Sequence, residues 1–133
     1  MVDAGAAPPR YDVLLVDDGD QIRRLIRAWL EGLGLNVVCA STGEQALEVA
    51  QACTLAVVLT DYELPGLAKV ELVRALKAAQ PGARLLVMSG AVLDEVDFQM
   101  LGAAGMDRFL HKPLGCSQVQ AAVLEEIGGS RAR

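Results

Sequence analysis

The sequence predicts an α/β domain in which a doubly wound, five-stranded parallel sheet is flanked by five helices. The first observation behind this prediction is that short apolar runs alternate with segments whose apolar residues recur at helical spacing. The second is that the runs are continuously apolar, as in parallel strands covered on both faces. The third is size: 133 residues, of which 53% are hydrophobic, suffice for one domain with a sizeable core and are too few for two.

The five predicted strands are short runs rich in Val and Leu. They lie at residues 13–16, 37–40, 55–59, 85–88 and 108–110. Because each is followed by a helical segment before the next begins, consecutive strands are expected to run parallel and to be joined by right-handed crossovers.

The segments between the strands have one apolar face, as helices that pack on a sheet do. The expected helices lie near residues 20–33, 42–50, 72–76, 92–101 and 117–127. Asp20 is a candidate cap for the first helix, which Gly32 and Gly34 end, and Ser41 with Thr42 opens the second. The residues expected to face the core from the first and last helices are Ile22, Leu25, Ile26, Trp29, Leu30, Leu33, Val119, Val123, Leu124 and Ile127.

The two ends of the chain differ in composition from the rest. Residues 1–10 are mostly small and include two prolines, and residues 128–133 begin with two glycines. We expect both to be flexible tails or linkers around a domain at residues 11–127.

Charge and cysteine usage exclude several classes of function. Twelve Lys and Arg against 17 Asp and Glu leave a net charge of −5, which argues against a surface for nucleic acid or anionic membrane. The chain has no apolar run long enough to span a membrane and no apolar signal core near its start. Three cysteines in no C-x-x-C spacing and a single histidine do not form a zinc motif, and they suit reduced thiols in the cytoplasm.

Polar residues gather where the predicted strands end. Asp17 and Asp18 follow the first strand, Asp61 the third, Ser89 the fourth and Lys112 the fifth. Ligands of doubly wound sheets bind at this edge, so the three carboxylates are expected to converge. Two like charges about 4 Å apart repel by on the order of 4 kcal/mol at an effective dielectric constant near 20, so the cluster must be protonated or neutralised. Carboxylate oxygens at an open, phosphate-binding edge favour Mg²⁺.

The residue types at these five positions indicate what kind of chemistry the site performs. A metal, a carboxylate, a hydroxyl and an ammonium group together form a site that handles a phosphoryl group. Taken singly, each residue has an ordinary explanation, since Asp after a strand is commonly a turn former or helix cap. Their joint placement at successive strand ends indicates a functional site.

Four motifs carry a resemblance to a known family. They are Val13-Leu-Leu-Val-Asp-Asp18, Thr60-Asp-Tyr-Glu-Leu-Pro-Gly66, Met88-Ser-Gly90 and Phe109-Leu-His-Lys-Pro113. In this order they resemble the receiver domain of two-component response regulators, the CheY-like domain, over residues 11–127. The resemblance implies a flavodoxin-like sheet with strand order 2-1-3-4-5 and a role as a phosphorylated signalling switch.

The resemblance implies roles for the acidic residues. Asp61 is expected to be the phosphoacceptor, a nucleophile that takes a phosphoryl group from the phosphohistidine of a histidine kinase or phosphotransfer protein. Asp17, Asp18, Asp61 and the backbone carbonyl of Glu63 are expected to hold Mg²⁺. The domain is then not an enzyme in its own right, although it assists its own phosphorylation and dephosphorylation.

The resemblance also implies a switch. Lys112 is expected to pair with the phosphoryl oxygens, Ser89 to hydrogen-bond them, and the Phe109 ring to turn inward when Ser89 moves. The Lys112–Pro113 peptide bond is expected to be cis. The downstream protein partner is expected to bind the face formed by the fourth helix, fifth strand and fifth helix.

Some positions depart from the family pattern or vary within it. Ala68 and Lys69 stand where the family usually has Asp-Gly, which removes a carboxylate cap from the third helix. Glu63 and Ala91 occupy variable positions that tune the phosphoryl lifetime in the family. The last helix has no Lys or Arg at residues 117–127, so the family's dimer mode through basic residues there is doubtful, and 21 residues after Lys112 leave no room for a DNA-binding output domain.

Two alternatives stay open at this point. Asp18-Gly-Asp20 is an Asp-x-Asp after the first strand, as in phosphohydrolases of the haloacid dehalogenase type, where Asp18 would be the nucleophile and Asp20 the acid/base. That interpretation leaves Asp61 without a role. The second alternative is an interaction module that works without phosphorylation.

Overall fold

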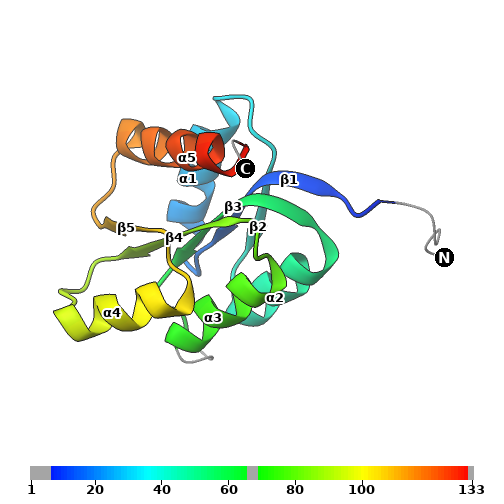
Figure 1. Ribbon diagram of the computed structural model, residues 1–133. Helices are drawn as coiled ribbons and strands as arrows, with labels where there is room; N and C mark the ends of the chain where they lie inside the picture. Colours follow the sequence, from blue (N-terminus) through cyan, green and yellow to red (C-terminus); the bar gives the residue numbers. More distant parts are fainter. Residues whose placement is uncertain (1–6, 66–68, 132–133) are drawn as a thin grey trace.

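The computed structural model describes residues 7–65 and 69–131, the last three by their backbone alone. Strands and helices alternate along this part of the chain (Figure 1). The elements are β1 Arg10–Val16, α1 Asp20–Glu31, β2 Val37–Ala40, α2 Gly43–Ala52, β3 Thr54–Asp61, α3 Lys69–Ala79, β4 Arg84–Ser89, α4 Glu95–Ala104, β5 Arg108–His111 and α5 Cys116–Arg131.

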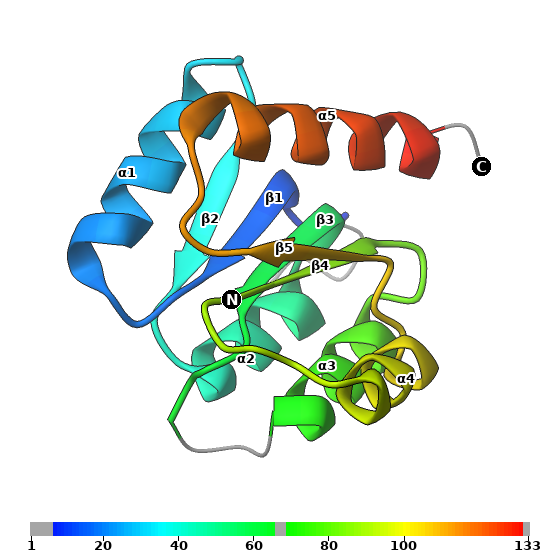
Figure 2. The same ribbon diagram turned by 90° about the vertical axis from the view of Figure 1, so that its left-hand side faces the viewer.

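The five strands form one parallel sheet in the order β2-β1-β3-β4-β5. Helices α1 and α5 cover one face, and α2, α3 and α4 cover the other (Figures 1 and 2). The predicted fold class, doubly wound α/β with strand order 2-1-3-4-5, is therefore confirmed.

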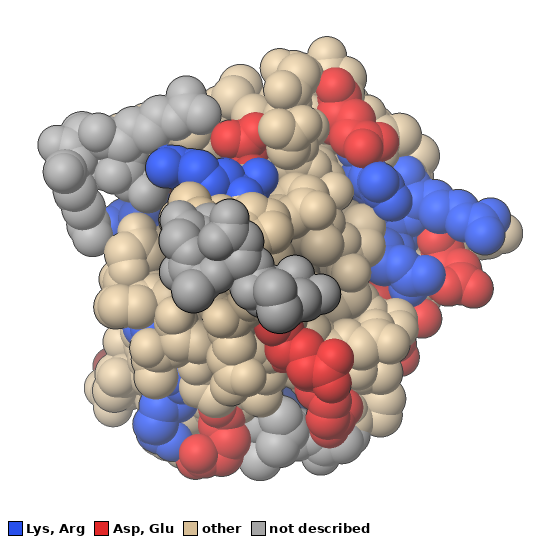
Figure 3. Space-filling view, turned by 90° about the vertical axis from the view of Figure 1, so that its right-hand side faces the viewer, with Lys and Arg blue, Asp and Glu red and all other residues tan. Residues whose placement is uncertain are grey.

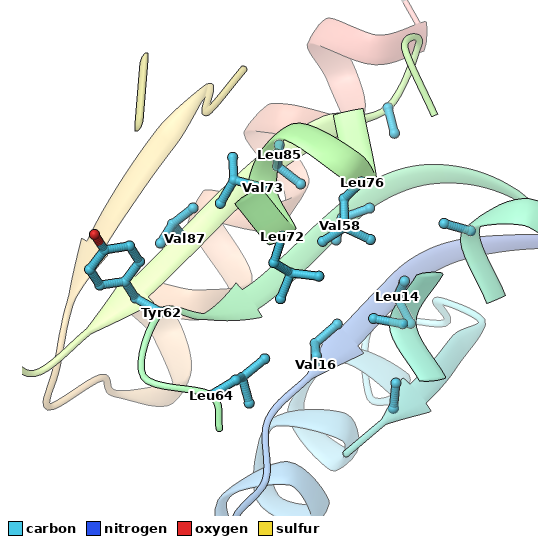
Figure 4. Packing of buried hydrophobic residues seen from close by; sticks show 14 of the residues in the cluster. Leu14, Val16, Val58, Tyr62, Leu64, Leu72, Val73, Leu76, Leu85 and Val87 are labelled. Atoms are coloured by element: carbon cyan, nitrogen blue, oxygen red, sulfur yellow. The ribbon is translucent and has the colours of Figure 1, made fainter. Parts of the chain in front are cut away.

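The core has two layers because alternate residues of each central strand point to opposite faces. On the side of α2, α3 and α4, Leu14, Val58 and Leu85 are at most 1% exposed and pack against Leu72 and Leu76 of α3 (Figure 4). On the other side, the buried residues Val13, Leu15, Val57, Leu59, Leu86 and Met88 pack with Ile26 and Leu30 of α1 and Val119 and Val123 of α5. Helices cover both faces of the sheet, which is why its strands are unbroken apolar runs in the sequence.

Helix α4 begins later than the sequence pattern suggested. It begins at Glu95, whereas Val92 precedes it and is 95% exposed. The Asp94 side chain accepts a hydrogen bond from the Asp97 N–H (2.8 Å), and the Asp97 carboxylate accepts one from the Asp94 N–H (3.0 Å). This capping box supplies partners for two N–H groups at that point, so the helix begins there.

Helix α5 is longer than predicted. It runs to Arg131, so the expectation that residues 128–133 form a flexible tail is wrong for residues 128–131. Glycine is a weak helix former, but it retains its N–H donor and therefore does not end a helix by itself. Residues 132–133, like residues 1–6 of the predicted N-terminal tail, lie outside the described residues, and β1 begins at Arg10, inside that predicted tail.

Further expectations for the helices need correction. Leu33 was assigned to the core face of the first helix but follows the end of α1 and is 36% exposed. Leu25 of α1 and Leu124 of α5 were assigned to the core but are 47% and 46% exposed. Both lie one position away from buried neighbours, on the edge of the apolar face, where helical spacing alone does not separate core from rim. Asp20 is the first residue of α1 rather than its cap, which is Gly19.

Two observations concern the surface. None of the helices in the described part of the chain is long and apolar enough to cross a membrane. Figure 3 shows the face at the right of Figure 1, where acidic and basic side chains lie beside one another instead of forming a patch of one sign.

Candidate functional site

The polar residues singled out in the sequence lie at the carboxyl ends of neighbouring strands. Asp17 follows β1, Asp61 ends β3 and Ser89 ends β4. Main-chain hydrogen bonds hold these ends side by side, from the Tyr62 N–H to the Met88 carbonyl and from the Lys112 N–H to the Ser89 carbonyl, both 2.8 Å. The parallel register therefore brings together residues that are far apart in the sequence.

Three carboxylates form a tight acidic cluster. Asp17, Asp18 and Asp61 each place one carboxylate oxygen within 4.8 Å of the others. Asp17 and Asp61 are only 2% and 6% exposed, whereas Asp18 is exposed. A buried charge needs a partner, so this cluster has the donor set and the charge of a site for a hard divalent cation.

Lys112 is the cation that faces this cluster. Its Nζ lies 3.5 Å from Asp17 Oδ2 and 3.4 Å from Asp61 Oδ2. Burial lowers the pKa of Lys112, but the charges of Asp61 and Asp17 outweigh it, and the net shift is upward. The ammonium group is thus held in its charged form beside the carboxylate that ends β3. The Lys112–Pro113 peptide bond is cis, as predicted.

The pKa values of Asp61 and Glu63 are moved in opposite directions. Burial, followed by a hydrogen bond to the Glu63 side chain, raises the pKa of Asp61 to about 6. Burial also acts to raise the pKa of Glu63, but hydrogen bonds from Ser89 and Asp61 outweigh it, so the pKa of Glu63 is lowered. In the metal-free protein, Asp61 is therefore the acid of this pair that takes up a proton first as the pH falls through about 6.

Ser89 and Ala91 contact this pair. Ser89 is fully buried, and its hydroxyl donates a short hydrogen bond to Glu63 Oε1. The Ala91 N–H donates to Ser89 Oγ at 3.0 Å. Ser89 is thus connected to Asp61 through Glu63, a contact that the sequence pattern did not indicate.

Phe109 lies on β5 and faces helix α4. Its ring makes an edge-to-face contact with Phe98, with the centroids 4.9 Å apart and the planes at 87°. Phe109 is partly buried and packs against the core on the side of α2, α3 and α4. It therefore links the edge strand of the sheet to the first turn of α4.

Arg23 is a site residue that the sequence reasoning missed. The sequence motifs gave it no role at the site, but its Nη1 donates to the Asp17 carbonyl at 2.9 Å and its Nη2 pairs with Asp20 at 2.5 Å. Its position one turn into the helix that follows the Asp pair was the available signal. Arg23 ties α1 to the connection that carries Asp17.

Two departures noted in the sequence have different outcomes. Ala68 lies outside the described residues, so the altered loop there stays a prediction. Lys69 is the first residue of α3, and its Nζ lies 5.0 Å from the centroid of the Tyr62 ring. This cation–π contact gives Lys69 a place beside the site.

The structure does not support the phosphohydrolase alternative. Within the described residues, the group of acids placed to share a cation contains Asp18 and Asp61, while the Asp20 side chain pairs with Arg23 and is not in that group. The acid/base that this alternative requires is therefore absent from the cluster.

A doubly wound sheet with acidic, hydroxyl and ammonium groups at the carboxyl ends of its strands is typical of phosphoryl-handling signalling domains. A family model for the response regulator receiver domain matches residues 13–124. The chain belongs to this family, as its motifs predicted.

Known proteins that are similar to this chain include receiver domains of solved structure. The virulence sensor protein BvgS of Bordetella pertussis is 36% identical over 123 residues, covering 86% of this chain and 10% of that protein. A CheY-like receiver domain from Methanospirillum hungatei JF-1 has the same fold, with a TM-score of 0.86 and 22% identity over 95% of this chain and 98% of the other. The receiver domain of the sensor histidine kinase PA1611 from Pseudomonas aeruginosa PAO1, solved with a magnesium ion in its active site cleft, is 27% identical with a TM-score of 0.77, over 89% and 98%.

The chain is short beside its curated relatives. It spans a tenth of the length of the BvgS proteins and between a quarter and a third of the other curated relatives with which we compared it. The family thus accounts for the receiver domain, which is one part of those longer proteins.

Proposed function

We propose that Asp61 accepts a phosphoryl group from a phosphohistidine and that the domain works as a phosphorylation-dependent switch. One observation carries this proposal: Asp17, Asp18 and Asp61 converge within 4.8 Å at the strand ends, and Lys112 lies 3.4 Å from Asp61. Within the described residues, no other group of three or more acids is placed to share a metal ion.

The transfer is a displacement at phosphorus. A carboxylate oxygen of Asp61 attacks, the P–N bond to the histidine breaks, a P–O bond to Asp61 forms, and the imidazole leaves with the electron pair of the broken bond. Because Lys112 lies beside Asp61, its ammonium group would stabilise the charge on the phosphoryl oxygens. The product is an acyl phosphate.

The acidic cluster fits Mg²⁺. Asp17, Asp18 and Asp61 supply hard oxygen donors, and the backbone carbonyl of Glu63 is the fourth ligand that we propose. When bound, the ion would neutralise charge on the carboxylates and on the phosphoryl oxygens. Arg23 would hold the Asp17 main chain in place beneath it, through its hydrogen bond to the Asp17 carbonyl.

The switch would run from the site to α4. Ser89 would bind a phosphoryl oxygen, and Phe109 would respond by turning inward, which changes its contact with Phe98. Val96 and Met100 of α4 are 60% and 48% exposed, so this helix offers an apolar surface. We propose that a downstream protein binds the face formed by α4, β5 and α5.

The phosphoryl donor is proposed to be a histidine kinase or phosphotransfer protein. A mostly apolar cavity of about 460 Å³ lies beside the site, between Ile22 and Ile26 of α1 and the segment from Lys112 to Leu114. Exposed Leu25 lies on the same helix. These apolar surfaces suit contact with a protein that brings its phosphohistidine to Asp61. We propose that the domain meets this donor in the cytoplasm.

We further propose that this chain binds no nucleic acid and turns over no substrate of its own. The net charge of −5 opposes nucleic acid, and the mixed charges seen in Figure 3 agree.

Glu63 and Ala91 are proposed to set the lifetime of the phosphorylated form, since both contact Ser89. Replacing Glu63 with Ala should therefore change the half-life of the aspartyl phosphate.

Incubation with acetyl phosphate and Mg²⁺ tests the phosphoacceptor. The parent protein should gain the mass of one phosphoryl group, and Asp61→Asn should gain none because the nucleophile is gone. Asp20→Asn is the matched control: it removes a nearby acid outside the cluster and should be phosphorylated normally.

The other outcomes identify the alternatives. Absence of an Asp61-dependent mass gain would favour the interaction module that works without phosphorylation. Repeated hydrolysis of a phosphomonoester that stops in Asp20→Asn would favour the phosphohydrolase.

A further inference from the structure

In the unphosphorylated protein, the Ser89 hydroxyl already donates its hydrogen to another side chain. Ser89 is 0% exposed, its Oγ accepts from the Ala91 N–H at 3.0 Å, and it donates to Glu63 Oε1. A hydroxyl carries a single hydrogen to donate. A phosphoryl oxygen and Glu63 therefore cannot both take the Ser89 hydrogen bond.

Glu63 is held close to Asp61 by its own backbone. The Glu63 N–H donates to Asp61 Oδ1 at 3.2 Å, so the side chain that binds Ser89 originates two residues from the proposed phosphoacceptor. The Ser89 backbone is fixed in turn, because its carbonyl accepts from the Lys112 N–H at 2.8 Å. Only the side chains of Ser89 and Glu63 are then free to exchange partners.

We propose that Glu63 is a positioning residue that holds the Ser89 hydroxyl before phosphorylation and competes with the phosphoryl group for it. The inference rests on the proposed function and deepens it. A phosphoryl group adds about 1.5 to 2 negative charges, which repel the Glu63 carboxylate. Glu63 is partly exposed, so its side chain can move into solvent and release Ser89.

A double-mutant cycle with beryllofluoride and Mg²⁺ measures this competition. With Ser89 present, Glu63→Ala should tighten beryllofluoride binding at least about tenfold, because the analogue no longer has to displace a charged hydrogen-bond partner. In the Ser89→Ala background, the same change should give a clearly smaller gain, due to charge alone. Equal fold-changes in the two backgrounds would overturn the proposal.

The resting state is tested without metal or analogue. The Ala91 N–H donates to Ser89 Oγ and also acts directly on the Glu63 carboxylate. The Ala91 amide resonance should therefore shift in Glu63→Ala, and it should shift clearly less when the same change is made in the Ser89→Ala background. Glu63→Gln, which retains an acceptor, should leave the resonance nearer to that of the parent. Glu48→Ala, which removes a charge from an exposed position of α2, is the matched control and should not shift the Ala91 resonance. An Ala91 resonance that does not shift in Glu63→Ala, or that shifts equally with and without the Ser89 hydroxyl, would show that Glu63 does not hold Ser89.

The two experiments separate this inference from the proposed function. If the parent fails to bind beryllofluoride in an Asp61-dependent manner, the phosphoacceptor proposal fails. The Ala91 resonance requires neither phosphorylation nor Mg²⁺, so it decides whether Glu63 positions Ser89 in either case.

Discussion

Asp61 and Glu63 are two acids, two residues apart, whose surroundings give them opposite protonation behaviour. Asp61 lies at the buried end of β3, and burial raises its pKa to about 6. Glu63 lies in the loop beyond, where the Ser89 hydroxyl and Asp61 stabilise its charged form. As the pH falls through about 6, the metal-free protein therefore takes up a proton on Asp61 before it takes one up on Glu63.

This leads to a stability prediction for the metal-free protein. The folded-state pKa of Asp61, about 6, exceeds its ordinary value of 3.8, so its contribution to stability is present at low pH and is lost as the pH rises through about 6. Between pH 5 and pH 7 the free energy of unfolding should fall by about 1 kcal/mol from this group. Glu63 adds little in this window, because its lowered pKa leaves it charged throughout.

Urea unfolding with a chelator at pH 5 and pH 7 measures the effect. Asp61→Asn should lose this part of the pH dependence, so the free-energy difference between variant and parent should grow in favour of the variant as the pH rises. A constant difference at both pH values would show that burial does not raise the pKa of Asp61.

At the scale of elements, α4 and α5 are held in place by features that the periodicity of the sequence does not contain. Helix α4 begins at its capping box and ends at Gly105, whose φ of +116° lies in the left-handed region. Helix α5 is tied to the sheet by ion pairs, Glu126 with Arg84 at 2.9 Å and Glu125 with Arg108 at 2.6 Å. These acids are thus paired within the chain, and the expectation that α5 does not form the family's dimer contact stays a prediction.

Two glycines, one within α4 and one that caps its C-terminal end, should respond oppositely to alanine. Gly105→Ala should lower the free energy of unfolding by at least about 1 kcal/mol, because a Cβ there meets the Lys77 side chain at 2.5 Å and the left-handed φ disfavours it. Gly102→Ala should raise it by up to about 1 kcal/mol, since it is exposed within the helix and a Cβ there meets nothing within 4 Å. Thermal unfolding of both variants measures these two changes in stability. Similar changes in both would contradict the assigned helix end.

For the whole molecule, the site joins strands that are distant in sequence, so its charge affects global stability. Asp17, Asp18 and Asp61 come from the ends of β1 and β3, the two strands at the centre of the sheet. Their mutual repulsion opposes the packing of these strand ends, and Lys112 from beyond β5 offsets it. A cation bound by all three should stabilise the entire fold.

Magnesium should accordingly raise the midpoint of thermal unfolding. At a concentration one hundred times its dissociation constant, the gain in the free energy of unfolding is about 3 kcal/mol for one site that exists only in the folded state. Asp18→Asn should lose most of this gain, whereas Asp20→Asn should keep it, because Asp20 lies outside the acidic cluster. Equal stabilisation of both variants would place the ion elsewhere.

Much of the fold and of the site was predictable because the signals are local. The strand at residues 37–40 and the N-cap at Thr42 agree with the structure, since a buried run and a capping hydroxyl are read directly from the chain. Helix ends were less predictable: Val92 continues an apolar pattern without being helical, and Gly128 lies within a helix that was expected to end before it. Such boundaries depend on capping and packing partners that periodicity does not contain.

The sequence by itself determined the alternation of strands and helices and which acids, hydroxyl and lysine stand at the strand ends, because apolar runs and the polar residues that end them are local features. Only the tertiary structure decided how those groups pair. Glu63 takes the Ser89 hydroxyl and Arg23 takes the Asp17 carbonyl. Such pairs depend on the parallel register and on the way α1 packs, which bring side chains within hydrogen-bond distance irrespective of their separation along the chain.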